Sequence, residues 1–248
     1  MHLQINIYKS FLALIANFIL VTVCFGNPPA TVWRADTRPP HEIFQQGFTS
    51  YGNNRDYVEH IVGESCSAEN SAFISTTTDQ NLAYDWAIFG LLRHRPAPPR
   101  YYIYEIRATD NFYGALNTLN HLAQTTHLPD AFALNYARRV AADQAEYSAL
   151  TRIQPQQIRS VTILSLDRQG RPVRSYLNNP SYSPADTHAN AGPFTGSDQF
   201  LPENLSRPMV TGEPPATACF LSPDELSQHP HFEPFLLNNF WIDDSITG

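Results

Sequence analysis

Residues 101–108, with the sequence YYIYEIRA, are the most clearly predicted strand in this chain of 248 residues. Their aromatic and β-branched side chains are typical of a strand inside a sheet. Short strands and helices alternate on both sides of this segment, which predicts a mixed α and β fold. Strands are expected at 32–35, 73–75, 160–166 and 173–177, and helices at 39–47, at 79–95 and from Pro129 onward.

The first 26 residues are predicted to be a signal peptide. Lys9 supplies the positive charge, residues 11–25 are almost wholly apolar, and Gly26 follows Cys24 and Phe25 as a small residue for the peptidase. An uncleaved membrane anchor is the alternative, but the apolar run is short for a membrane span. The mature chain is therefore expected to begin near Asn27.

The rest of the chain is expected to divide in two. Residues 27–180 contain all the predicted strands and helices, and so are expected to form the main folded domain, which would carry any catalytic site. Residues 181–248 are rich in Pro, Ser, Asn and Gly without periodicity. They are interpreted as a loop-rich tail held by Cys219, and not as an independent domain.

Net charge and composition argue against a general nucleic-acid-binding protein. Of the 16 basic residues, Lys9 is removed with the signal peptide. The mature chain then has 15 arginines and 23 acidic residues, which gives a net charge of −8. A general nucleic-acid binder would need a basic face, so no nucleic-acid partner is expected. The mature chain also has no lysine. A general preference for arginine explains this absence, and so does avoidance of ubiquitination inside a eukaryotic cell.

Two cysteines remain after signal removal, Cys66 and Cys219. In an exported chain they most simply form one disulfide, with two buried free thiols as the alternative.

The usual nucleotide and metal motifs are missing from the sequence. It has no G-x-G-x-x-G, P-loop or H-E-x-x-H motif. His229 and His231 are interpreted as solvated tail residues, so no metal site is expected. Ser75, His60 and an aspartate could be imagined as a hydrolase triad, but Ser75 lacks the G-x-S-x-G turn of such enzymes.

Four segments carry the candidate chemistry when they are taken together. They are 32–40 (VWRADTRPP), His60, 73–77 (FISTT) and 144–147 (QAEY). In these segments, and in Gly52–Asn54, Cys66, Asn70–Ser75 and Asp110–Gly114, the sequence resembles the catalytic subunits of pertussis-like ADP-ribosyltransferase toxins. The resemblance runs from about Pro28 to Thr195 and returns around Cys219.

The resemblance implies an α+β ADP-ribosyltransferase fold, in which two small packed β-sheets form a cleft for NAD and helices flank them. It implies that NAD⁺ loses nicotinamide through an oxocarbenium-like transition state. Glu146 would bind the ribose 2′-hydroxyl and stabilise the developing charge. Ser75 would hold Glu146 by a hydrogen bond, and Arg34 would contact the NAD phosphate or ribose.

Other matched positions bear on NAD binding and on the acceptor. His60 corresponds to a histidine that assists the incoming nucleophile, with a purely structural role as the alternative. Arg38 and Tyr51 are expected to contact NAD, Tyr51 beside the nicotinamide or the acceptor. Gln144 is also expected at the NAD site. Family members that modify arginine tend to have glutamate there, so an acceptor other than arginine is implied.

The family implies a secreted toxin subunit that acts in the host cytosol. Its expected substrate is a cysteine of G-protein α subunits, and its expected partners are receptor-binding carrier (B) subunits that contact the tail. Reduction of the Cys66–Cys219 bond in the target cell would free the site. The alternatives are an NAD glycohydrolase and a secreted binding relative without catalysis.

Overall fold

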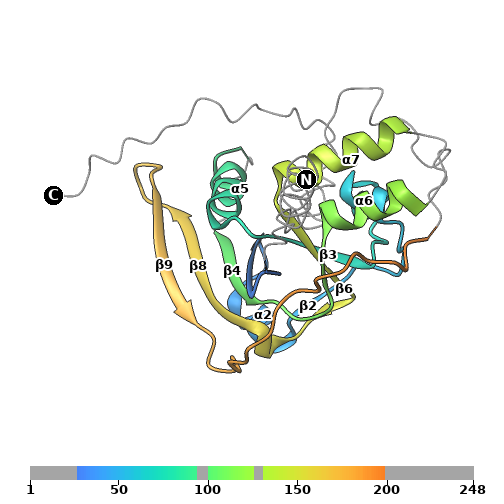
Figure 1. The fold of residues 1–248 in the computed structure, drawn as a ribbon. Helices are drawn as coiled ribbons and strands as arrows, with labels where there is room; N and C mark the ends of the chain where they lie inside the picture. Colours follow the sequence, from blue (N-terminus) through green and yellow to red (C-terminus); the bar gives the residue numbers. More distant parts are fainter. Residues whose placement is uncertain (1–26, 94–99, 126–130, 199–248) are drawn as a thin grey trace, which may run out of the picture.

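The computed structural model describes residues 27–93, 100–125 and 131–198 (Figure 1). The strands are β1 Thr31–Asp36, β2 Phe48–Thr49, β3 Phe73–Thr77, β4 Tyr101–Arg107, β5 Phe112–Gly114, β6 Glu146–Leu150, β7 Arg152–Ile153, β8 Ile158–Leu166 and β9 Pro172–Asn178. The helices are α2 Pro40–Gln46, α3 Tyr57–Ile61, α4 Glu64–Ser67, α5 Gln80–Arg93, α6 Ala115–Thr125 and α7 Ala131–Asp143, with a 3₁₀ turn, η1, at Pro155–Gln157. These elements confirm the predicted α+β class.

Seven strands form one antiparallel sheet in the order β5-β6-β3-β1-β4-β8-β9, and β2 pairs with β7 apart from it. Within the described residues, β1 and β3 share one paired position, Trp33 with Thr77, whereas β1 pairs with β4 at every position from Thr31 to Asp36. The large sheet is therefore split into two halves that diverge at this pair. The two packed sheets expected from the sequence correspond to these two halves of one sheet, and β2 and β7 form a further, two-stranded sheet.

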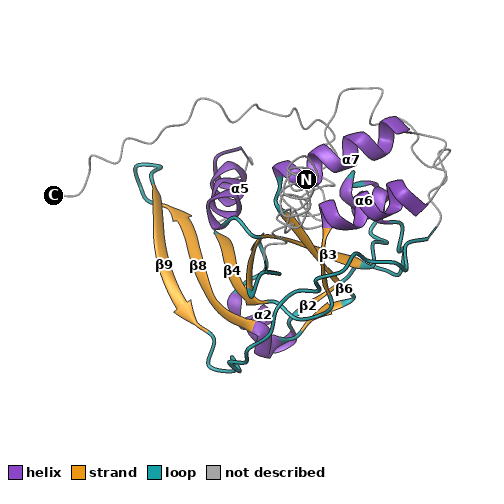
Figure 2. Cartoon of the chain, in the orientation of Figure 1, coloured by secondary structure: helices purple, strands orange, loops and turns teal. Residues whose placement is uncertain are grey.

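Different helices cover the two halves, although α5 also contacts β3 (Figure 2). Helix α5 packs on β1, β4 and β8, while α3, α6 and α7 pack on one another, and α6 and α7 pack on β6. Between 27 and 198, with the two gaps noted above, no helix is long and apolar enough to cross a membrane.

Local sequence accounts for the ends of the short helix α2. Pro40 stands in its first turn, where a missing N–H costs nothing, and Gly47 ends it with a φ of +72°. A Cβ atom at residue 47 would lie 2.1 Å from the carbonyl oxygen of Ile153, so only glycine fits between α2 and β7. The predicted helix at 39–47 is confirmed.

The predicted strands and most predicted helices are also confirmed. Residues 101–107 form β4 near the middle of the sheet, with its first four side chains buried. The helix expected at 79–95 is α5, described from Gln80 to Arg93. The helix expected from Pro129 is α7, which begins at Ala131; Pro129 itself lies outside the described residues.

Residues 179–198 contain neither helix nor strand, in keeping with the loop-rich character predicted for this region. They nevertheless pack on the body of the protein, because the side chains of Asn179, Ala189 and Phe194 are buried. The proposed carrier contacts and the rest of the tail, including Cys219, lie outside the described residues.

Candidate active site

The predicted catalytic residues converge where β3 and β6 run side by side. Glu146 is the first residue of β6 and pairs with Thr77, while Ser75 pairs with Ser148 two residues further on. Helix α7 ends at Asp143, and the chain turns into β6 through Ala145, whose φ is +45°. A positive φ is unusual for alanine, and here it allows the reversal that brings Glu146 onto the sheet.

Glu146, His60 and Ser75 form one buried group. His60 Nε2 lies 3.2 Å from Glu146 Oε1 and 3.2 Å from Ser75 Oγ. His60 and Ser75 are 0% exposed and Glu146 is 3% exposed. These three residues come from α3, β3 and β6, so the group depends on the packing of α3 against the sheet.

The other ring nitrogen of His60 also has a polar partner. Nδ1 lies 2.9 Å from Ser71 Oγ, and that oxygen already accepts the N–H of Phe73 at 3.1 Å. Ser71 thus holds Nδ1, while Glu146 and Ser75 lie at Nε2. The ring is therefore held from both sides, and Nε2 is the nitrogen directed at the carboxylate of Glu146.

A chain of hydroxyl groups also supports Glu146. Ser148 Oγ donates to Glu146 Oε1 at 2.8 Å, and Tyr57 Oη donates to Ser148 Oγ at 3.1 Å. Burial first, and then the charge of Glu146, raise the pKa of Tyr57, so its hydroxyl stays protonated as a donor.

This arrangement differs from the expected role of Ser75. The hydroxyl that contacts Glu146 is that of Ser148, because residues two apart on one strand face the same side. Ser75 Oγ lies instead on His60 Nε2, the nitrogen that Glu146 also contacts. Ser148, Ser71 and Tyr57 were not identified from the sequence. The Glu-x-Ser spacing on a strand was a usable signal for Ser148.

Arg34 lies at the split in the sheet, and its side chain is 2% exposed. From β1 its Nη1 donates to the carbonyl oxygen of Ser75 on β3 at 2.8 Å, and its Nε donates to Asp36 Oδ2 at 3.1 Å. Since β1 and β3 share one paired position, this guanidinium replaces ladder hydrogen bonds that the diverging strands lack. Arg34 therefore fixes the strand that carries Ser75.

Asp36 joins the two arginines of this segment and was not identified from the sequence. Arg38 donates two hydrogen bonds to the Asp36 carboxylate, from Nε at 2.8 Å and from Nη2 at 2.7 Å. Burial alone would raise the pKa of Asp36, but the hydrogen bonds and charge of Arg38, with the charge of Arg34, hold it below its ordinary value. The Arg38 side chain is 26% exposed, so it lies at the surface side of the group.

Gln144 and Tyr51 lie around this core. Gln144 is buried, and its backbone carbonyl oxygen accepts a hydrogen bond from the hydroxyl of Thr77 at 2.8 Å. Tyr51 is partly buried and close enough to Arg38 to affect its pKa. Burial would lower the pKa of Arg38, but Asp36 above all, and Tyr51 in addition, raise it. Arg38 is thus fixed as a cation.

Cys66 lies behind His60. Its Sγ is 3.4 Å from His60 Nδ1, and the residue is 2% exposed. Cys66 is disulfide-bonded, and it is the one cysteine among the described residues, so its partner lies outside them. The pairing with Cys219 therefore stays a prediction.

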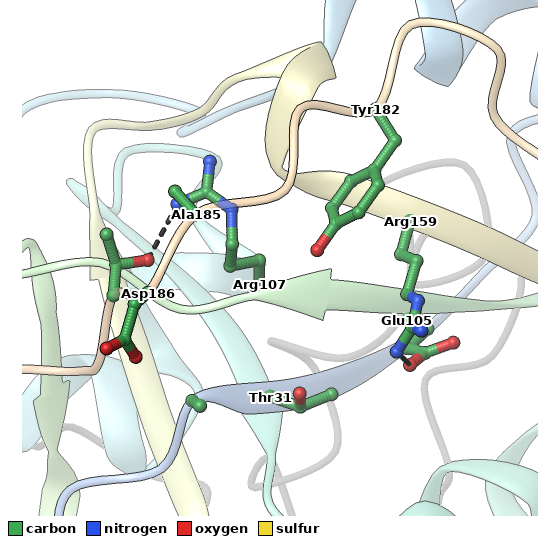
Figure 3. Close-up of a pocket in the computed structure, with 9 residues that line it drawn as sticks. Thr31, Glu105, Arg107, Arg159, Tyr182, Ala185 and Asp186 are labelled. Atoms are coloured by element: carbon green, nitrogen blue, oxygen red, sulfur yellow. Dashed lines mark hydrogen bonds and ion pairs between the residues drawn. The ribbon is translucent and has the colours of Figure 1, made fainter.

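A separate cavity of about 100 Å³ lies where β1 begins and β4 ends (Figure 3). Its polar lining includes Thr31, Glu105, Arg107, Arg159, Tyr182 and Asp186. None of the predicted catalytic residues lines it. Across residues 27–198, apart from the gaps, no three His, Cys, Asp or Glu side chains gather as a metal site would require.

The fold resembles that of ADP-ribosylating toxins. The structure is similar to that of EcPltA, with a TM-score of 0.61 and 30% sequence identity over 71% of this chain and 99% of that one. It is similar to full-length CARDS toxin with a TM-score of 0.55 and 30% identity, over 72% of this chain and 33% of that one. The chain is thus of the class of NAD-dependent mono-ADP-ribosyltransferase toxins.

Sequence comparison identifies the family. Residues 27–204 match the model described as "Pertussis toxin, subunit 1". Pertussis toxin subunit 1 of Bordetella pertussis is 35% identical over 218 residues, 82% of this chain and 78% of that protein. The subunit 1 homolog of Bordetella parapertussis is 36% identical over 185 residues, 68% of this chain and 66% of that protein. The chain belongs to the pertussis toxin subunit 1 family, which confirms the resemblance drawn from the sequence.

Proposed function

We propose that this protein cleaves NAD⁺ at the bond between nicotinamide and ribose and transfers ADP-ribose to a cysteine of a host G-protein α subunit. The observation that carries the proposal is the buried group of Glu146, His60 and Ser75. Glu146 is held there by Ser148 while His60 Nε2 lies 3.2 Å from its Oε1. Family membership supports the same chemistry.

Glu146 is proposed as the catalytic carboxylate. As nicotinamide leaves with the electron pair of the C–N bond, positive charge develops on the ribose. A carboxylate with its orientation fixed by Ser148 and His60 needs little reorganisation to stabilise that charge. The same oxygen atoms can accept a hydrogen bond from the ribose 2′-hydroxyl.

Arg38 and Arg34 are proposed as the groups that hold NAD⁺. Arg38 is the more exposed of the two, and its two hydrogen bonds to Asp36 orient the guanidinium. Because Arg34 donates to the Ser75 carbonyl, we propose that it also positions the strand that carries Ser75. Tyr51 lies near Arg38, and we propose that it contacts the nicotinamide or the acceptor.

His60 is proposed to accept the proton of the incoming thiol while the new S–C bond forms on the ribose carbon. Gln144, two residues before Glu146, has no carboxylate with which to deprotonate a guanidinium. These two residues together favour a cysteine acceptor over arginine.

Access to this site requires a change in the protein, because His60 is 0% and Glu146 3% exposed. We propose that the change follows reduction of the Cys66–Cys219 bond after entry into the host cytosol. Cys66 Sγ lies 3.4 Å from His60 Nδ1, so movement at Cys66 reaches the catalytic group directly. Export as residues 27–248 and delivery by receptor-binding carrier subunits complete the proposal.

The test uses full-length reduced protein, labelled NAD⁺ and a purified inhibitory G-protein α subunit. Glu146→Asp should lower the turnover of nicotinamide release about 100-fold or more while the KM for NAD⁺ changes less than about threefold, since the carboxylate acts on the transition state. Glu105→Asp shortens another carboxylate of the same sheet and should leave turnover unchanged.

The acceptor is tested in parallel. Label should enter the α subunit and be lost when its cysteine near the C-terminus is replaced by serine. Nicotinamide release without label transfer would indicate a glycohydrolase, and no release at all would indicate an inactive relative. Full activity of Glu146→Asp would refute the mechanism.

A further inference from the structure

Residues 187–198, here called the strap, connect the region after β9 with the helix that carries His60. In Figure 1 the orange segment that follows β9 runs to the side of the molecule where α6 lies, and the strap is its last part. Hydrogen bonds hold it along the way: the N–H of Ala189 donates to Pro29 O at 2.9 Å, that of Asn190 to Phe112 O at 2.8 Å, and that of Phe194 to Thr118 Oγ1 at 3.1 Å. The strap is thus part of the folded body.

Phe194 is the part of the strap that enters the core, with 5% exposure. Its ring packs edge-on against Phe73 at 5.1 Å between centroids and lies 6.1 Å from the ring of Tyr57. Phe73 and Tyr57 are also the aromatic neighbours of His60, at 5.1 Å and 6.0 Å. One layer of rings therefore separates Phe194 from the catalytic imidazole.

The end of the strap binds the beginning of α3. The N–H of Tyr57, the first residue of that helix, donates to Ser197 Oγ at 3.1 Å. One residue further along the strap, the N–H of Asp198 donates to Arg55 O at 3.3 Å, and Asp198 Oδ2 accepts the N–H of Arg55 at 3.2 Å. These bonds join the strap to the chain that enters α3.

Helix α3 needs this support because it has only five residues, Tyr57–Ile61. So short a helix has no stability of its own, and its orientation comes from what packs on it. His60 Nε2 lies 3.2 Å from each of its two partners, near the limit of a hydrogen bond. A small tilt of α3 would therefore break the contacts of His60 with Glu146 and Ser75.

We infer that Phe194 is a positioning residue, which acts through Tyr57 and Phe73 to hold His60 against Glu146 and Ser75. The strap holds the proposed catalytic histidine through these rings, and Ser197 assists it at the start of α3. This inference rests on the proposed role of His60. Because the strap leads into the tail, a partner that displaces the tail would change the activity through the same contacts.

The experiment measures ADP-ribose transfer by full-length reduced protein, with kcat and the KM for NAD⁺ determined separately. Phe194→Ala should lower kcat about tenfold or more and change KM less than about twofold, because a displacement of about 1 Å in a catalytic group has effects of this order. Phe194→Leu should restore most of the activity. Ser197→Ala leaves the core intact and should lower kcat by a few fold.

Two comparisons separate positioning from general loss of stability. Leu164→Ala empties a buried site under α5, away from His60, and should leave kcat unchanged at a matched loss of thermal stability. In a His60→Asn background, Phe194→Ala should change kcat less than about twofold, since the residue it positions is gone.

The outcomes are distinguishable. If His60→Asn retains full transfer activity, the proposed role of His60 fails, and the inference fails with it. If His60→Asn is impaired but Phe194→Ala behaves like Leu164→Ala, or lowers kcat equally in both backgrounds, the inference alone is overturned. If Phe194→Ala does not fold, Ser197→Ala decides the question through the same cycle with His60→Asn, and an equal loss of kcat in both backgrounds overturns the inference.

Discussion

Replacing Ser148 with alanine tests whether the orientation of Glu146 limits catalysis. The hydroxyl of Ser148 donates to Glu146 Oε1 at 2.8 Å and accepts the hydroxyl of Tyr57 at 3.1 Å. After the substitution Tyr57 Oη still reaches the carbonyl oxygen of Tyr113 at 3.3 Å, so no buried donor loses its last partner. The change therefore removes one hydrogen bond to a charged group and little else.

The size of the effect follows from that bond. A hydrogen bond to a charged group contributes about 1.5–3 kcal/mol, and 1.4 kcal/mol corresponds to a tenfold change in rate. If Ser148 holds Glu146 in the transition state, Ser148→Ala should lower kcat for nicotinamide release roughly 10- to 100-fold. Tyr57→Phe removes only the outer bond of the chain, so its kcat should fall less than that of Ser148→Ala.

The assay is steady-state nicotinamide release from NAD⁺ by reduced protein, with thermal unfolding measured on the same samples. Ser160→Ala is a matched control, since Ser160 Oγ also donates to a glutamate of this sheet, Glu105, at 2.8 Å. Ser160→Ala should lose comparable stability and retain its kcat. A Ser148→Ala protein whose kcat stays within about threefold of the parent would refute the idea that this hydroxyl orients the carboxylate.

Two further predictions concern charged groups beside the site. Burial first, and then the charge of Glu59, raise the pKa of Asp56 to about 7, above its value in the unfolded chain, so stability falls as the pH rises from about 4 through 7. Asp56→Asn keeps an oxygen that caps the Val58 and Glu59 N–H groups. Urea titration should find this variant about 2–4 kcal/mol more stable than the parent at pH 8 and equally stable at pH 4. An equal gain at both pH values would exclude the raised pKa of Asp56 as the cause. Arg34→Lys keeps the charge but cannot bridge Ser75 O and Asp36 at once. The variant should lose about 1–3 kcal/mol of stability in urea titration and most of its turnover in nicotinamide release. A variant as stable as the parent would contradict the bridging role of Arg34.

Part of this fold and site could be predicted from the sequence because the signals are local. The strand at residues 101–108 shows its β-branched and aromatic pattern directly, and Gly47 marks the end of α2. Arg34, Ser75 and Glu146 were found through the family resemblance, and the structure places them on β3 and on the two strands that flank it, β1 and β6.

The remainder depends on contacts between distant residues. Ser71 and Tyr57 matter only because α3 packs against β3 and β6, which no local pattern encodes. The turn at Ala145 has a positive φ that alanine rarely adopts, so the start of β6 gave no turn signal. The split between β1 and β3 is a matter of register, which hydrophobic alternation alone does not determine.

The split also explains why the site lies where it does. Two strands that diverge after one pair, Trp33 with Thr77, leave backbone groups that need partners, and Arg34 supplies a donor to one of them. A guanidinium buried in this way needs a counter-charge, which Asp36 provides, and Asp36 in turn holds Arg38 at the surface side. The buried Arg34 and the more exposed Arg38, the two cations proposed to hold NAD⁺, thus have one structural cause. A substitution that restored pairing between β1 and β3 would be expected to stabilise the sheet and abolish NAD⁺ binding together.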